Sequence, residues 1–184
     1  MTTSPPRYDR WPLALQHAMR LRGALLPCGP GMRGVGWPDT PPVRLAAIAG
    51  ALEGGHVAAM LTAAWVWGAA PDPGIPLSIA GSAGKARTPI ASDTRRYELR
   101  FGPADVTVFG EFGVTTPVRT TLDLLHLSAS FGAEERRACH ELLALAGITI
   151  EHMTELLVAL RRPYIRRARE RFREVAAEHT PALP

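Results

Sequence analysis

The sequence predicts an α+β fold, with a small mixed or antiparallel β-sheet in the middle, helices packed on it and a helical C-terminal third. Three observations predict this class. Of the 184 residues, 46% are hydrophobic and 21% are charged, as in globular chains that bury a core. Short apolar runs separated by glycine and proline occupy residues 76–115. Helically spaced apolar residues with capping signals occupy residues 116–177.

The N-terminal region, residues 1–42, is predicted to contain one helix and a small hairpin. Apolar residues at helical spacing indicate a helix over 8–22 that Gly23 ends. Nine glycines and prolines between residues 24 and 42 leave room for only two short extended segments, at 24–26 and 32–37. We expect this region to precede a core domain over 43–177, and residues 178–184 to form a tail.

The first half of the core is predicted to change from helix to strand. Residues 43–52 are strong helix formers, and residues 56–68 begin extended and then become helical. Trp65 and Trp67 lie in that second helix, where large aromatic rings are usually buried. Strands are predicted at 77–80, 97–101, 106–109 and 113–115, with a basic hairpin tip beginning at Gly81 between the first two.

The last third of the core is predicted to contain four helices with their own boundary signals. Thr116 is a good N-cap and is followed by Pro117 at the first helical position. Gly147 closes the second helix, and Thr149 caps the third. The fourth helix is expected over residues 164–177.

The charge pattern suggests an acidic partner. The net charge is +4, and 20 of the 21 basic residues are arginine, whose planar fork suits phosphate and carboxylate groups. Residues 161–173 hold seven arginines against one glutamate, and a predicted contact face is formed by Arg162, Arg166, Arg169 and Arg173. A second patch comprises Lys85, Arg87, Arg95 and Arg96. The alternative interpretation is a solvated face of an amphipathic helix.

No catalytic motif is present. The segment that begins at Gly81 lacks the first glycine and the hydroxyl residue of a phosphate-binding loop, and no serine lies in a G-x-S-x-G elbow. The six histidines have no metal-ligand spacing. We therefore predict that the chain is not an enzyme and binds no metal or cofactor.

The sequence also predicts a cytoplasmic protein with no membrane partner. The longest apolar stretch, residues 57–70, is shorter than a membrane-spanning helix, and the N-terminus does not read as a signal peptide. Cys28 and Cys139 are far apart in the sequence, and we expect both to be reduced.

The segment Gly113–Leu124, GVTTPVRTTLDL, resembles a stretch typical of the AbiEi family of antitoxins from type IV toxin–antitoxin systems, in particular its actinobacterial members. The motif positions are Thr116, Pro117, Arg119, Thr120 and Asp123. Shorter similarities follow in order at residues 33–35, 62–68 and 148–173. The chain differs in having a shortened N-terminal region in place of a winged helix-turn-helix, and Ala59-Met60 where relatives commonly have Ser-His.

The resemblance implies an antitoxin-like regulatory protein, a DNA-binding transcriptional regulator of a toxin–antitoxin or phage-defence locus that binds its own promoter. One alternative is a protein-interaction module that does not bind DNA and recognises a cognate toxin or another acidic protein. A second is a degenerate nuclease relative, which would need clustered carboxylates from Asp105, Glu111 and Asp123. Arg119 and Asp123 are four residues apart on one helix, so they can pair with each other or each bind the loop before the helix, and we expect them to serve the fold.

Overall fold

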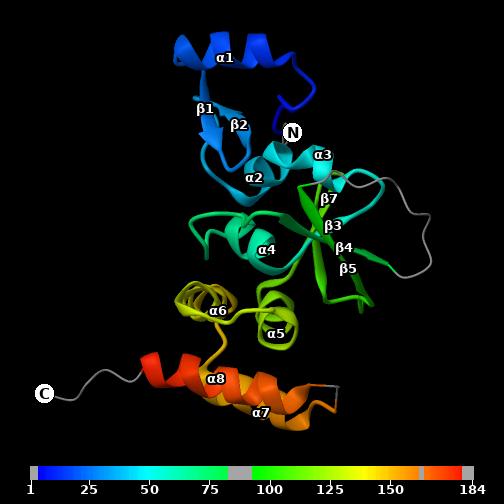
Figure 1. The fold of residues 1–184 in the computed structure, drawn as a ribbon, viewed down its shortest axis with the longest axis vertical. Coiled ribbons are helices and arrows are strands. Elements are labelled where there is room, and N and C mark those ends of the chain that lie inside the picture. Colours follow the sequence, from blue (N-terminus) through cyan, green and yellow to red (C-terminus); the bar gives the residue numbers. More distant parts are fainter. Residues whose placement is uncertain (1–3, 83–92, 162–163, 180–184) are drawn as a thin grey trace, which may run out of the picture.

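The computed structural model describes residues 4–82, 93–161 and 164–179, and these ranges form an α+β fold, as predicted. Its parts follow one another along the long axis of the molecule (Figure 1). The N-terminal helix and hairpin lie at one end, a five-stranded sheet with its helices lies in the middle, and the last two helices lie at the other end.

The N-terminal module consists of α1 (Leu13–Leu21) and a two-stranded antiparallel sheet of β1 (Leu25–Cys28) and β2 (Gly31–Gly34). The helix begins at residue 13 and not at the predicted residue 8. Pro12 is its N-cap, and the extended ψ of 138° at Pro12 keeps the preceding residues out of the helix. Gly23, with φ of 73°, ends the helix as predicted. Gly29 sits where a Cβ atom would lie 2.8 Å from the Trp65 ring, so glycine allows the hairpin to approach the core.

The central sheet is mixed, in the order β5-β4-β3-β7-β6. Its strands are β3 (Val57–Ala58), β4 (Leu77–Ser82), β5 (Thr94–Leu99), β6 (Val106–Phe109) and β7 (Phe112–Thr115). The prediction of a hairpin tip between the strands at 77–80 and 97–101 was wrong. The corresponding strands, β4 and β5, are parallel neighbours, with Leu77 opposite Thr94. Parallel strands require a crossover connection, so they are not the arms of a hairpin.

The helices between the module and the sheet form much of the core. The helix predicted at 43–52 is divided into α2 (Pro41–Ala47) and α3 (Ala49–Leu52), because Ile48 leaves helical geometry at φ of −112°. α4 (Met60–Val66) directly follows β3, as the extended-then-helical prediction required. Trp65 is buried on α4, and Trp67 is half-buried and donates its indole N–H to Thr115 O at 2.8 Å.

The C-terminal third contains α5 (Pro117–Leu127), α6 (Ala133–Ala146), α7 (Ile150–Ala159) and α8 (Ile165–His179). Thr116 and Thr149 cap α5 and α7, and Gly147 ends α6 at φ of 64°, as predicted. The four helices bury Leu124, Leu142, Leu157 and Phe172 in one continuous core.

None of the helices in the described ranges is by itself both long and apolar enough to cross a membrane. α6 and α7 reach that length and composition only when they are taken together across a bend of 101°.

Candidate functional site

The motif that begins at Thr116 joins the start of α5 to the loop between β5 and β6. The Thr116 hydroxyl accepts a hydrogen bond from Arg119 N at 3.4 Å and donates one to Ala104 O at 3.3 Å. The backbone N–H of Thr116 donates to Asp105 O at 2.9 Å. Thr116 therefore caps the helix and fixes the loop at the same time.

Arg119 is the centre of this junction and is only 6% exposed. Its Nε donates to both carboxylate oxygens of Asp123, at 2.9 and 3.0 Å. Its Nη1 donates to Asp105 Oδ2 at 2.6 Å and to Arg100 O at 3.0 Å, and the guanidinium lies 5.2 Å from the centre of the Phe101 ring. Of the two expected arrangements, Arg119 shows both, because it pairs with Asp123 and its guanidinium also holds the loop.

Thr120 completes the same junction. Its hydroxyl lies 3.0 Å from Thr115 O and 2.9 Å from Thr116 O, and it is 2.7 Å from the Thr115 hydroxyl. Because the polar groups of the motif contact the protein itself, this geometry gives the motif a role in holding α5 against the sheet.

The arginines of α8 do not form one uniform contact face. Arg169 donates to two carbonyl oxygens in the last turn of α7, to Leu157 O and Val158 O, both at 3.0 Å. Unpaired carbonyls and the negative end of the helix dipole make this position favourable for a cation. Arg169 therefore caps α7.

Two arginines outside the predicted face, Arg167 and Arg171, cap the C-terminal end of α5. Arg171 donates to Leu125 O at 3.0 Å and to Ser128 O at 2.9 Å, and Arg167 donates to His126 O. Arg171 also lies over the Phe131 ring, 5.1 Å from its centre. Their spacing of four residues places both side chains on one side of α8, but nothing in the sequence indicates that this side faces α5.

The other arginines of the predicted face differ in their surroundings. Arg166 is 93% exposed and lies 3.7 Å from Glu170, and Arg173 is exposed. Glu174 and Glu178 of the same helix pair with Arg136 at 3.7 and 2.5 Å. Arg162 lies outside the described residues. The exposed surface of α8 therefore mixes both signs of charge, which weakens attraction to a polyanion.

The second predicted patch is only partly described, because Lys85 and Arg87 lie outside the described residues. Arg95 is exposed on the edge strand β5 and lines a cavity of about 190 Å³, together with Ser78, Tyr97 and Glu135. Arg96 points to the opposite face of the sheet and lies over Gly81 of β4, where a Cβ atom would be 3.0 Å from its Nη2.

The sequence prediction missed a surface on the N-terminal module. Leu13 and Leu21 are 72% and 90% exposed. They share a stripe with His17 and Arg20, at spacings of four, seven and eight residues along α1, and both of these are exposed as well. We call these four residues the α1 face. Exposed Arg22 follows directly after it.

The sequence that contains the α1 face carries charge of one sign. From residue 10 to residue 38 the sequence contains four arginines and His17 but no aspartate or glutamate. Within the part of the chain that the structure describes, four of the nine exposed large apolar side chains lie between residues 13 and 35. The missing acidic residues were the sequence signal that could have located this surface.

The three carboxylates of the nuclease alternative do not gather into a metal site. Asp105 and Asp123 both contact Arg119, whereas Glu111 lies 3.9 Å from Arg7. Within residues 4–82, 93–161 and 164–179, no group of three or more histidine, cysteine, aspartate or glutamate residues could hold a metal ion.

Both cysteines are free thiols in buried positions. Burial raises the pKa of the Cys28 thiol to about 11, and it raises the pKa of the Cys139 thiol well above its ordinary value. Because the thiolate is the reactive form, neither residue has the environment of a catalytic nucleophile.

No model of a known protein family matches this chain, and no curated protein matches it. Among solved structures, the chain is similar to the crystal structure of the RV2827C protein from Mycobacterium tuberculosis, with 20% sequence identity and a TM-score of 0.46. The similarity covers 96% of this chain and 73% of that one.

Proposed function

We propose that this chain is an antitoxin-like regulatory protein that acts by binding an acidic partner protein through the α1 face. The observation that carries this proposal is the pair of exposed leucines beside Arg20 on a helix that lies within a stretch, residues 10–38, without aspartate or glutamate. An apolar stripe on a small helix is typical of a protein contact. The motif around Thr116 supports the antitoxin part of the proposal only through its family resemblance.

The chemistry of the partner follows from the two halves of the α1 face. Leu13 and Leu21 favour an apolar strip on the partner, because burying them removes apolar surface from water. Arg20 of the face, with Arg22 directly after it, favours carboxylates along the edge of that strip. Under the antitoxin hypothesis, the partner is the toxin encoded by the adjacent gene of the same operon.

DNA binding is a second candidate, and one specific observation favours it. The absence of acidic residues from 10 to 38 removes electrostatic repulsion between the N-terminal module and phosphate groups. The exposed leucines do not contribute to phosphate contacts, and for this reason we rank a protein partner first.

The test compares two probes: the purified product of the adjacent gene, and a duplex covering the chain's own promoter. The face variant is Leu13→Gln/Leu21→Gln, and the control variant is Arg166→Gln/Arg173→Gln on α8. We expect the face variant to bind the gene product at least about tenfold more weakly, and the control to bind it like the wild type. Equal binding by both variants, or binding to the duplex alone, would overturn the proposal.

A further inference from the structure

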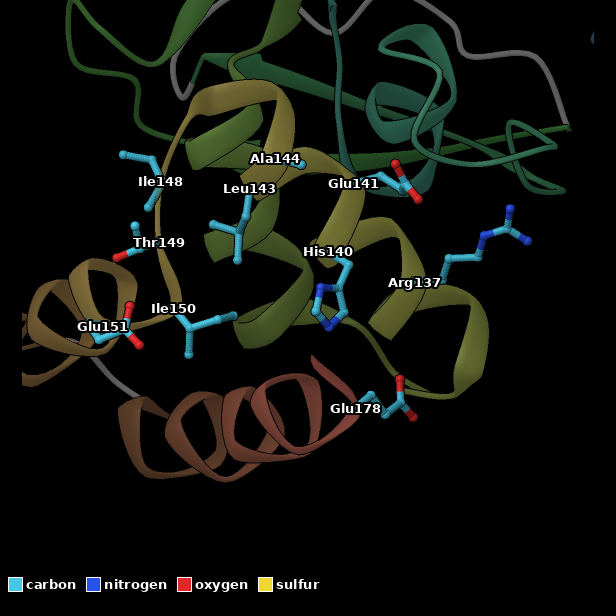
Figure 2. Close-up of a pocket in the computed structure, with 10 residues that line it drawn as sticks. All are labelled: Arg137, His140, Glu141, Leu143, Ala144, Ile148, Thr149, Ile150, Glu151 and Glu178. Carbon is cyan, nitrogen blue, oxygen red and sulfur yellow. The ribbon is translucent and has the colours of Figure 1, made fainter. Parts of the chain in front are cut away.

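At the opposite end of the molecule from α1, a groove lies between α6, the start of α7 and the end of α8 (Figure 2). Its volume is about 780 Å³. The apolar part of its lining comes from Leu143, Ala144, Ile148 and Ile150. Such a groove, lined by three helices and the loop between two of them, has the general form of a site that receives one amphipathic helix.

Carboxylates make up half of the six polar residues of the lining, and His140 and Thr149 are two of the others. The lining includes the carboxylates of Glu141, Glu151 and Glu178 and the guanidinium of Arg137 (Figure 2). Glu178 is paired with Arg136, whereas Glu141 is exposed to solvent. With Glu178 compensated by Arg136, Glu141 and Glu151 against Arg137 leave the lining with a small negative charge, in a chain whose net charge is +4.

The α1 face has the complementary composition. It carries two exposed leucines, which match the apolar lining, and His17 and Arg20, which match the carboxylates. The helix spans nine residues, about 14 Å at the usual rise per residue. The two surfaces lie at opposite ends of one molecule, so α1 can reach only the groove of another copy.

We propose that the α1 face of one copy docks in the α6–α8 groove of a second copy. The inference uses the same α1 face as the proposed function, and it adds that the groove offers the apolar and acidic chemistry expected of the partner protein. The contact is head-to-tail, so each bound copy leaves one free α1 face and one free groove. A partner protein that covers the α1 face competes with self-association.

The experiment is light scattering coupled to size-exclusion chromatography, over about a hundredfold dilution series of the full chain. The face variant Leu13→Gln/Leu21→Gln keeps the groove intact. The groove variant Ala144→Arg keeps α1 intact and places bulk and positive charge in the groove at an exposed position. The matched control is Leu145→Arg, which changes the next residue of α6, 57% exposed and outside the groove lining.

We expect the wild type and Leu145→Arg to rise in mass with concentration, and each of the other two variants to remain monomeric. An equimolar mixture of the face variant and the groove variant should form a one-to-one heterodimer, because each supplies the surface that the other lacks. A wild type that stays monomeric at every concentration would overturn the inference. So would a mixture that stays monomeric, or a groove variant that still associates, since the latter would indicate contact between two α1 faces.

Failure of this inference can be distinguished from failure of the proposed function. If only self-association is absent, the wild type and Ala144→Arg still bind the adjacent-gene product with equal affinity. If the proposed function is wrong, neither binds that product, whatever their oligomeric state.

Discussion

Replacement of Arg119 by methionine tests how much the junction between α5 and the sheet contributes to stability. The substitution removes the charged partner of Asp123, a side chain that is 6% exposed. It also removes the hydrogen bonds to Arg100 O and to Asp105, the latter 28% exposed. Removing one partner of a buried ion pair costs about 3–5 kcal/mol, and the partly exposed Asp105 adds little because water replaces the lost contact. We therefore expect the free energy of unfolding to fall by about 3–5 kcal/mol.

The assay is urea unfolding followed by tryptophan fluorescence, with Arg136→Met as the control. Arg136 also contacts two carboxylates, but Glu174 and Glu178 are 55% and 47% exposed, so the control should lose no more than about 1 kcal/mol. The double variant Arg119→Met/Asp123→Leu should recover part of the loss, because it leaves no buried charge. A loss below about 1 kcal/mol for Arg119→Met, or additive effects in the double variant, would refute this account of the junction.

Three further predictions concern other parts of the chain. Arg171→Met should lower the free energy of unfolding by about 1–3 kcal/mol, because it removes the cap of α5. The control Arg173→Met should change it by less than about 0.5 kcal/mol. If the two variants unfold at the same urea concentration, the capping role of Arg171 is contradicted. Iodoacetamide should alkylate Cys28 slowly at pH 8 and faster as the pH approaches about 11, where its thiolate forms. Cys139 should react only after unfolding. Rapid labelling of either thiol in the folded protein at pH 8 would contradict this prediction. The hydrogen bond from Arg7 lowers the pKa of Asp9 in the folded state. The stability that this hydrogen bond provides is therefore fully present above the unfolded-state pKa of about 3.9, and it is lost as the pH falls through the folded-state pKa. Thermal melts of Asp9→Asn should therefore lose less stability than wild type on acidification below about pH 4, and parallel losses would exclude the contribution of Asp9.

The parts of the fold that the sequence predicted well are those with local signals. Thr116, Gly147 and Thr149 act within one helical turn of their own positions, so their roles depend little on distant residues. The parallel pairing of β4 with β5 has no such signal. It depends on which strands meet in space, and a glycine-rich segment between two strands is equally compatible with a crossover.

The break at Ile48 has a similar explanation. Apart from Gly50, good helix formers continue through residue 52, but tertiary packing overrides that preference. A Cβ atom at Gly31 would overlap the carbonyl of Ala47, so the hairpin packs closely against the end of α2 and fixes the backbone there.

The candidate site shows the same division between local and distant information. The pairing of Arg119 with Asp123 could be predicted from their spacing on one helix. The capping of α5 by Arg167 and Arg171 could not be predicted, because these arginines lie more than 40 residues after the carbonyls that they bind. Their role depends on how α8 packs against α5. Charge runs alone do not distinguish arginines that bind backbone carbonyls from arginines that face solvent.

The most direct test of the proposed function is the affinity of the chain for the product of its adjacent gene, measured by fluorescence anisotropy at about 50 and 200 mM salt, with its own promoter duplex as the second probe. A protein contact built largely on Leu13 and Leu21 predicts binding to the gene product that changes by less than about tenfold between the two salt concentrations and is lost in Leu13→Gln/Leu21→Gln. The contradicting result is tight binding to the duplex, with an affinity that falls by a factor of about a thousand between about 50 and 200 mM salt, and no binding to the gene product. That result would identify the N-terminal module as a phosphate-binding surface.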